Sequence, residues 1–328
     1  MTGPVASDSG DPQAEYAALR DGVGIVDQSV AGSVLVSGPD TFSFLDSLIS
    51  ADVSHLTDGT GVHSLLLTPR GKLDVDFRLL RVGDVAWIDT EPGFAEAFTA
   101  SLSRYRIRVD VEIIDRSAGW GLLQVRGPAT DDLLISLEVK PPPEVAHAHL
   151  PWESTRLVRV DRPVGVDVVG SHDALSSAWA AFVEQGATPV GLEVAEAHRI
   201  AAGVPRQGHD LDESTIPQEA GLDIDAVSFD KGCFLGQELV CRIDSRGRVN
   251  RFLRLLHIDG PAPAVGAEIL SDGDVVGSVT SVGDAGAGTV ALGYVHRGIE
   301  PPADVGIRLA SGDLADARIG VLPGTDEV

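Results

Sequence analysis

The chain has 328 residues, of which 43% are hydrophobic and 23% are charged, and this balance excludes a largely disordered protein. Its formal net charge of -24 argues against direct binding to nucleic acid, because phosphate contacts need clustered Lys and Arg. Single cores usually stop growing at roughly 250 to 300 residues, so we expect more than one domain. No stretch approaches the roughly 20 apolar residues of a membrane span.

The cysteine content indicates the compartment. Cys233 and Cys241 are too few for a disulfide framework or a tetrahedral zinc site, so a reducing compartment is the simpler inference. The acidic N-terminal segment has neither the basic stretch nor the apolar core of a secretory signal. We therefore expect a cytoplasmic protein that folds as a monomer, with no bound metal and no membrane partner.

The first predicted elements form a repeated unit. Residues 33–37 (SVLVS) form a strand that leads into Gly38-Pro39 and a helix with its apolar residues on one face. The same order recurs 89 positions later, where GLLQVR leads into Gly127-Pro128 and another helix. This recurrence indicates an internal repeat.

The segments after each copy also have clear patterns. After the first come a meander of strands, a helix and a further strand, at residues 62–68, 72–81, 85–90, 92–103 and 106–115. After the second come a hairpin, at residues 154–160 and 164–170, and a helix that Ser171 caps and Gly186 ends. Both copies therefore mix strands with helices, which is α+β architecture in an order similar to two ferredoxin-like units.

A helix at residues 191–202 is followed by a long polar segment, residues 203–223, of the kind that often carries binding groups. From about residue 249 the pattern changes to short strands separated by glycine-containing turns. This change predicts a small antiparallel barrel as a separate C-terminal unit.

Residues 231–238 (KGCFLGQE) are the most informative motif. Gly232 and Gly236 allow tight turns, and a helix is expected to begin near Gly236. The positive charge of Lys231 and the helix N-terminus would both favour the thiolate form of Cys233. The alternative is that Cys233 is a small buried apolar residue.

Other polar residues allow two interpretations. Glu238 and Arg242 are spaced for an ordinary helical ion pair. Asp74 and Asp76 lie on one strand, where a period of two would place both carboxylates on the same face, either as a site or as a solvated surface. Glu219 is either a surface acid or part of a site near the cysteine motif.

Several common catalytic motifs are missing from the sequence. GxxxxGK[ST], HExxH, GxSxG and GxGxxG do not occur, so nucleotide-binding, metalloprotease and hydrolase functions have no local support. His147 and His149 follow a proline run, and we interpret them as members of a solvated loop rather than as metal ligands.

The segment KGCFLGQELVCR closely resembles the KGC(F/Y)xGQE motif of YgfZ-type folate-binding proteins, relatives of the glycine-cleavage T-protein. The resemblance extends to GPDTFSFLDSLISADV, LLLTPRGKLDVDFRLL, RIAAGVPRQG and IPQEAGLD, and so to nearly everything after about residue 15. It implies a three-domain ring. Two T-protein-like units would be interleaved in residues 15–248, the barrel would take residues 249–328, and tetrahydrofolate would occupy the central opening.

The resemblance also implies a function. Members of this family are associated with the assembly or repair of iron-sulfur proteins, including enzymes that modify tRNA, and Cys233 matches the motif cysteine. We therefore expect its thiol to open onto the folate cavity and to act beside the folate. The other motif matches are Lys231, Gly232, Gly236, Gln237, Glu238 and Arg242. Glu219 and Arg199 are further candidates for folate binding, since a carboxylate suits the pterin edge and an arginine suits the glutamate tail.

Two other functions remain open. In the T-protein branch an aspartate after a GG turn assists one-carbon transfer, and Asp76 matches its place, which would make the chain a folate-dependent aminomethyltransferase. The other is a folate-binding scaffold without catalysis. Relatives often carry Glu or Gln where this chain has Ala201, and authentic T-protein lacks the motif cysteine.

Overall fold

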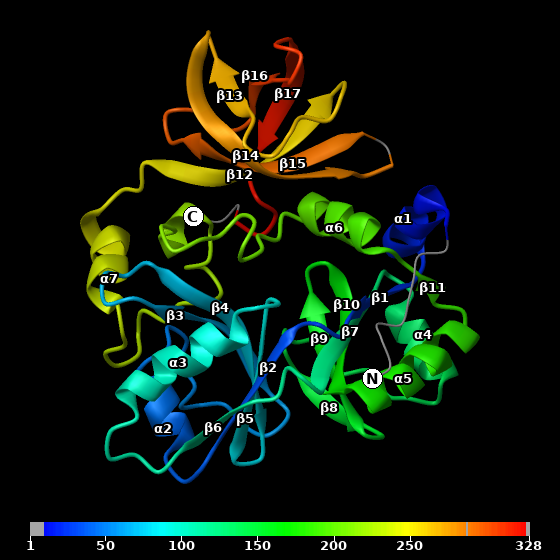
Figure 1. Cartoon of the computed structure of the whole chain (residues 1–328), viewed down its shortest axis with the longest axis vertical. Helices are drawn as coiled ribbons and strands as arrows, with labels where there is room; N and C mark the ends of the chain where they lie inside the picture. The colour runs from blue at the N-terminus through cyan, green and yellow to red at the C-terminus, as the bar shows by residue number, and fades with distance from the viewer. Residues whose placement is uncertain (1–9, 287, 326–328) are drawn as a thin grey trace.

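The computed structural model describes residues 10–286 and 288–325, which form three parts arranged in a triangle (Figure 1). Two parts are mixed α/β units, each with its own sheet, and the third is a closed barrel. This arrangement confirms the predicted α+β fold with a C-terminal antiparallel β-barrel. Among the described helices, none is both long and apolar enough to cross a bilayer.

The first unit contains a five-stranded antiparallel sheet with the order β3-β4-β5-β2-β6. Its elements are β2 (Gly32–Ser37), α2 (Thr41–Asp46), β3 (Gly61–Leu67), β4 (Leu73–Val82), β5 (Val85–Thr90), α3 (Ala95–Tyr105) and β6 (Glu112–Asp115). Alternate residues of the strands, such as Val34 and Val75, are buried against α2 and α3, and Phe98 of α3 belongs to the same core. The apolar residues that repeat every two positions in the strands and every 3.6 positions in the helices thus pack in one core.

The second unit contains a six-stranded sheet with the order β11-β1-β7-β10-β9-β8, in which only the β1–β11 pair of the described strands is parallel. Its strands are β1 (Gly24–Gln28), β7 (Trp120–Arg126), β8 (His149–Trp152), β9 (Thr155–Asp161), β10 (Val164–Ser171) and β11 (Thr188–Pro189). Its helices are α1 (Pro12–Asp21), α4 (Thr130–Ser136), α5 (His172–Glu184) and α6 (Leu192–Ala201). Ser171 caps α5 as predicted, accepting a hydrogen bond from the Ala174 amide.

The chain passes from one sheet to the other between β1 and β2. β1 pairs with β7 of the second unit, whereas β2, four residues farther along the chain, pairs with β5 and β6 of the first. The two units are therefore interleaved in sequence.

The internal repeat rests on equivalent glycines after β2 and β7. Gly38 and Gly127 have φ values of +128° and +124°, where L side chains are strained. A Cβ atom would lie 2.3 Å from the Asp110 carbonyl oxygen at Gly38 and 2.3 Å from the Gly22 carbonyl oxygen at Gly127. Both copies therefore require glycine before their helices.

The last part is a closed barrel with the order β12-β15-β14-β13-β16-β17. Its strands are β12 (Arg251–Asp259), β13 (Glu268–Ser271), β14 (Asp274–Asp284), β15 (Thr289–His296), β16 (Ala303–Arg308) and β17 (Leu314–Gly320). The chain reaches it through η1 (Pro217–Glu219) and α7 (Gln237–Arg246), the helix predicted to begin near Gly236.

One predicted strand is shorter than expected. The pattern of residues 106–115 predicts a strand throughout, but only Glu112–Asp115 is paired. Its partner β2 ends at Ser37, opposite Glu112, so the preceding residues have no strand beside them.

Candidate functional site

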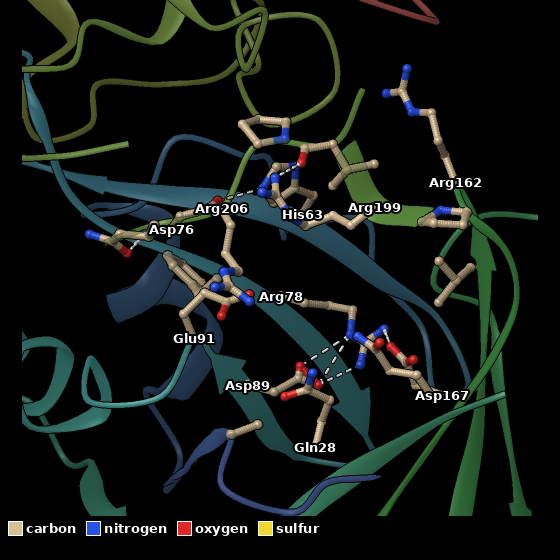
Figure 2. A pocket seen from close by; sticks show the side chains of 18 of the residues that line it. Gln28, His63, Asp76, Arg78, Asp89, Glu91, Arg162, Asp167, Arg199 and Arg206 are labelled. Carbon is tan, nitrogen blue, oxygen red and sulfur yellow. Dashed lines mark hydrogen bonds and ion pairs between the residues drawn. The ribbon is translucent and has the colours of Figure 1, made fainter. Parts of the chain in front are cut away.

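A cavity of about 1380 Å³ lies where the two sheets, α6, the loop of residues 203–211 and the C-terminal segment 322–325 meet (Figure 2). Its described lining includes five arginine and eight Asp or Glu side chains beside apolar residues such as Phe77 and Leu222. Asp76 and Arg199, both predicted site residues, line it. The cavity thus offers a ligand both apolar surface and more charged groups than most ligand pockets contain.

His63 of β3 joins two carboxylates at one side of the cavity. Its Nε2 lies 2.5 Å from Asp76 Oδ1, and its Nδ1 lies 3.3 Å from Asp225 Oδ1. Burial disfavours the imidazolium, but the charges and hydrogen bonds of Asp76 and Asp225 outweigh burial and raise the pKa of His63 to about 10. His63 is therefore a cation at neutral pH.

The prediction that Asp74 and Asp76 share a face is wrong. A bulge opposite Leu66 and Leu67 interrupts the β3–β4 register, so the side chains alternate irregularly at this point. Asp74 accepts a 2.6 Å hydrogen bond from Ser101 of α3, whereas Asp76 faces the cavity.

Gln207 fits the same irregular stretch of β4. Its side-chain nitrogen donates to the Asp74 carbonyl oxygen at 2.8 Å, and its side-chain oxygen accepts from the Asp76 amide at 2.9 Å. A single buried side chain therefore fixes the 203–211 loop to the strand that carries Asp76.

A charge network at the floor of the cavity connects the two sheets. Arg78 of β4 pairs with Asp89 of β5 at 2.7 Å and with Asp167 of β10 at 2.6 Å (Figure 2). Arg126 of β7 also binds Asp167. Burial raises the pKa of Asp89 despite Arg78. For Asp167, burial is outweighed by the two guanidinium groups, which lower its pKa.

Arg199 belongs to a second network of ion pairs in the cavity lining. It binds Glu196 one turn earlier on α6 at 2.7 Å and the buried Asp210 at 2.8 Å. Asp210 also accepts hydrogen bonds from Thr280 and Ser281 of the barrel strand β14. Arg199 therefore connects α6, the 203–211 loop and the barrel.

Glu91, just after β5, is a half-buried acid of the lining that lies left of the centre of the cavity view (Figure 2). Burial raises its pKa to about 7, although Arg206 and Arg199 act in the opposite direction. It is thus able to gain or lose a proton near neutral pH.

The ammonium group of Lys231 binds to the C-terminal end of α2 and the residues that follow it. Its side chain is 1% exposed, and Nζ donates to the carbonyl oxygens of Asp46, Ile49 and Ala51 at 2.7, 3.1 and 2.8 Å. It also pairs with the Asp46 carboxylate at 3.0 Å. These contacts hold the motif against α2, and a ligand-binding role for Lys231 stays a prediction.

Cys233 is exposed in the loop before α7 and is not among the described residues that line the cavity, so the expectation that its thiol opens onto this cavity is wrong. The two motif glycines differ. Gly236 has φ +81°, and a Cβ there would lie 2.6 Å from the Thr68 carbonyl oxygen, whereas nothing lies within 4 Å of a Cβ at Gly232. Gly236 fits against the turn at Gly71, and Gly232 faces open space.

The remaining predicted residues also lie outside the described cavity lining. Gln237 is half-buried, and Glu238 and Arg242 are exposed on α7. Glu219 is buried and accepts a hydrogen bond from Arg251 of β12 at 3.0 Å. Their predicted roles in folate binding stay predictions.

His147 and His149 do not belong to a solvated loop, because both side chains are largely withdrawn from solvent. Burial lowers the pKa of His147 to about 3 and that of His149 to about 4. Arg156 donates a hydrogen bond to His149 Nδ1. Among the described residues, no group of three His, Cys, Asp or Glu side chains could hold a metal ion.

Sequence reasoning did not identify His63, Arg78, Glu91 and Gln207 as members of the site. His63 and Arg78 are directly opposite each other across the β3–β4 hairpin. Counting outward from the PRG turn would have placed His63 near Asp76. Glu91 gave no comparable signal, because TEPG reads as an ordinary polar turn.

The chain matches known proteins over most of its length. The family model described as the GCVT N-terminal domain matches residues 8–231. An aminomethyltransferase of Thermus thermophilus is 31% identical over 94% of this chain and 89% of its own length. A putative chloroplastic transferase of Arabidopsis thaliana is 27% identical over 93% of this chain and 72% of its own length.

A solved structure has the same fold. The glycine cleavage system aminomethyltransferase T of Bartonella henselae superimposes with a TM-score of 0.84 at 23% identity, covering 95% of this chain and 89% of that one.

Proposed function

Because the chain belongs to the GCVT N-terminal domain family, we propose that its cavity binds a reduced folate. We also propose that Cys233, which lies outside the cavity lining, acts in the assembly or repair of iron-sulfur proteins. The observation that carries the proposal is the charged cavity with Asp76 on its wall. Its volume of about 1380 Å³ exceeds the roughly 300 to 1,000 Å³ of common ligand pockets, so a folate-sized molecule has room.

The residues present suit the chemistry of a folate. The pterin edge offers paired N–H donors, which match a carboxylate, and the glutamate tail offers carboxylates, which match arginine. Glu91 is an acid without an ion-pair partner among the described residues, Asp76 is an acid that pairs with His63, and Arg162 is an exposed arginine at the cavity. A bound folate would supply a carrier for one-carbon groups.

The placement of Cys233 supports the accessory part of the proposal. The thiol is exposed and lies apart from the cavity lining, so a partner protein can reach it while a folate is bound. The resemblance of residues 231–238 to the YgfZ-type motif is the further support. The acidic surface favours a link to tRNA through a modifying enzyme rather than by direct contact.

A second candidate is aminomethyl transfer to a reduced folate, which the names of the relatives favour. Asp76 would then act on the reacting nitrogen. Its side chain is positioned by His63, whose Nε2 lies 2.5 Å from Asp76 Oδ1, and a carboxylate placed beside the reacting nitrogen would stabilise a developing positive charge.

The test compares Cys233→Ala, Cys241→Ala and Asp76→Asn with the wild type in three assays. These are binding of 5-formyltetrahydrofolate, rescue of an iron-sulfur enzyme in cells that lack this protein, and aminomethyl transfer in the glycine cleavage reaction. We expect Cys233→Ala to bind the folate and fail in rescue, whereas the matched Cys241→Ala variant rescues. Equal rescue by both cysteine variants removes Cys233 from the function.

The same assays separate the second candidate. Transfer activity that Asp76→Asn abolishes and Cys233→Ala retains would favour the aminomethyltransferase. Absence of folate binding by the wild type would overturn both candidates.

A further inference from the structure

Four charged residues of the described cavity lining, Glu91, Asp161, Glu193 and Arg162, form no ion pair with another described residue. Among the three acids, Glu91 is half-buried, whereas Asp161 and Glu193 are exposed. Arg78, Arg126, Arg199 and Arg206 each have an acidic partner within 3.0 Å. Among the described residues, neither Glu91 nor Arg162 forms an ion pair or a side-chain hydrogen bond.

Glu91 is held in this position by its backbone. Its carbonyl oxygen accepts hydrogen bonds from Thr90 Oγ1 at 2.9 Å and from the Phe94 amide at 3.2 Å, which fixes the turn between β5 and α3. The carboxyl group is therefore carried on a rigid turn while its own oxygens remain available.

The charged groups around Glu91 come from three elements. Arg206 lies on the 203–211 loop, Glu196 and Arg199 on α6, and Asp76 on β4. All four have partners of their own, since Arg206 pairs with Glu196, Arg199 with Asp210 and Asp76 with His63. None of the four therefore needs Glu91 as a partner.

Arg162 lies on the turn between β9 and β10, well apart from Glu91 in the cavity view (Figure 2). Its side chain is exposed and passes close to Gly324, where a Cβ would lie 2.3 Å from a guanidinium nitrogen. The cavity therefore has an acceptor at one side and a cation near solvent at another.

From this arrangement we propose that Glu91 binds the paired N–H donors of a 2-amino-4-oxo-pyrimidine ring and that Arg162 binds the carboxylate at the other end of the ligand. The proposal rests on the proposed function, because it assigns the orientation of the folate in the cavity. A carboxylate accepts such a donor pair in parallel, as it accepts the two N–H groups of a guanidinium.

The experiment measures the affinities of two probes, 5-formyltetrahydrofolate and 6-methyltetrahydropterin, which share the pyrimidine edge but differ in the presence of the glutamate tail. Glu91→Gln should weaken both probes by about 10- to 100-fold, since a charge-assisted pair is lost. Arg162→Gln should weaken only the probe with the tail. Glu193→Gln, at another acid in the lining, is the matched control.

The pH dependence of the wild type gives a second, independent measurement. With a pKa of about 7, Glu91 is about one-tenth ionised at pH 6 and nine-tenths ionised at pH 8, so 5-formyltetrahydrofolate should bind about tenfold more tightly at pH 8. Glu91→Gln should remove this difference. His209→Gln, which alters the imidazole bound to Arg206, should retain it.

The outcomes separate the two levels of the proposal. If the wild type binds neither probe, the proposed function fails and the orientation fails with it. If the wild type binds and Glu91→Gln binds both probes equally well, only the orientation is overturned. If Glu91→Gln does not fold, a wild-type affinity that is the same at pH 6 and pH 8 overturns it.

Discussion

Replacing Arg78 by Met tests whether the charge network at the cavity floor stabilises the contact between the two sheets. Met has a similar length but no charge. Asp167 would keep Arg126 as a partner, whereas Asp89, only 10% exposed, would lose its cation. Removing one partner of a buried ion pair costs about 3 to 5 kcal/mol, so we expect a loss of that size in the free energy of unfolding.

The assay is urea unfolding at pH 7, with Arg308→Met as the control. Arg308 and Glu268 form a similar pair, but their side chains are 45% and 49% exposed, so this change should cost about 1 kcal/mol or less. Adding Asp89→Asn to Arg78→Met should restore part of the loss, because no charge is then buried. A loss below about 1 kcal/mol for Arg78→Met would refute the reasoning.

The pH dependence of the same variant has a defined sign. The pKa of Asp89 in the folded protein is raised, mainly by burial, so the folded state holds this proton more tightly than the unfolded state. Acidification therefore favours folding at this residue. The difference between Arg78→Met and the wild type should become smaller between pH 7 and pH 5, and a constant difference would contradict this account.

Three further changes test other contacts. Lys231→Met should cost about 3 kcal/mol in urea unfolding, since it leaves the Asp46 carboxylate and three carbonyl oxygens without their donor, and a neutral result would show that these contacts contribute little. Gly236→Ala should destabilise the protein and lower its melting temperature, because its Cβ would lie 2.6 Å from the Thr68 carbonyl oxygen. The folded pKa of His63, about 10, exceeds the unfolded value of about 6.5, so its contribution is complete below pH 6.5 and is lost as the pH rises through 10. The free energy of unfolding of His63→Gln, measured from pH 6 to pH 10, should fall less than that of the wild type, and equal slopes would contradict the pairing.

Local patterns identified most of the elements, because they depend on periodicity and on turn residues. The glycines after β2 and β7 predicted the repeat, and their positive φ values explain why the signal is strong. The length of β6 could not be predicted in this way. It depends on where its neighbour β2 ends, which the pattern within residues 106–115 does not record.

The site was harder to predict, because it depends on contacts between distant segments. A one-residue bulge separates Asp74 from Asp76, and no pattern of alternation within β4 indicates it. Lys231 is basic and close to Cys233 in sequence, yet its charge is bound to the end of α2. Glu91 becomes notable only when the partners of the surrounding arginines are known.

This topology also determines how much of the chain must be synthesised before each strand can pair with its neighbours. β1 is synthesised early, but its neighbours β7 and β11 lie about a hundred and more residues later, at 120–126 and 188–189. During synthesis the backbone groups of β1 therefore have no strand partner until the residues of the five-stranded sheet have been synthesised. Nascent chains arrested between these two points should therefore depend on chaperones more than the finished protein does.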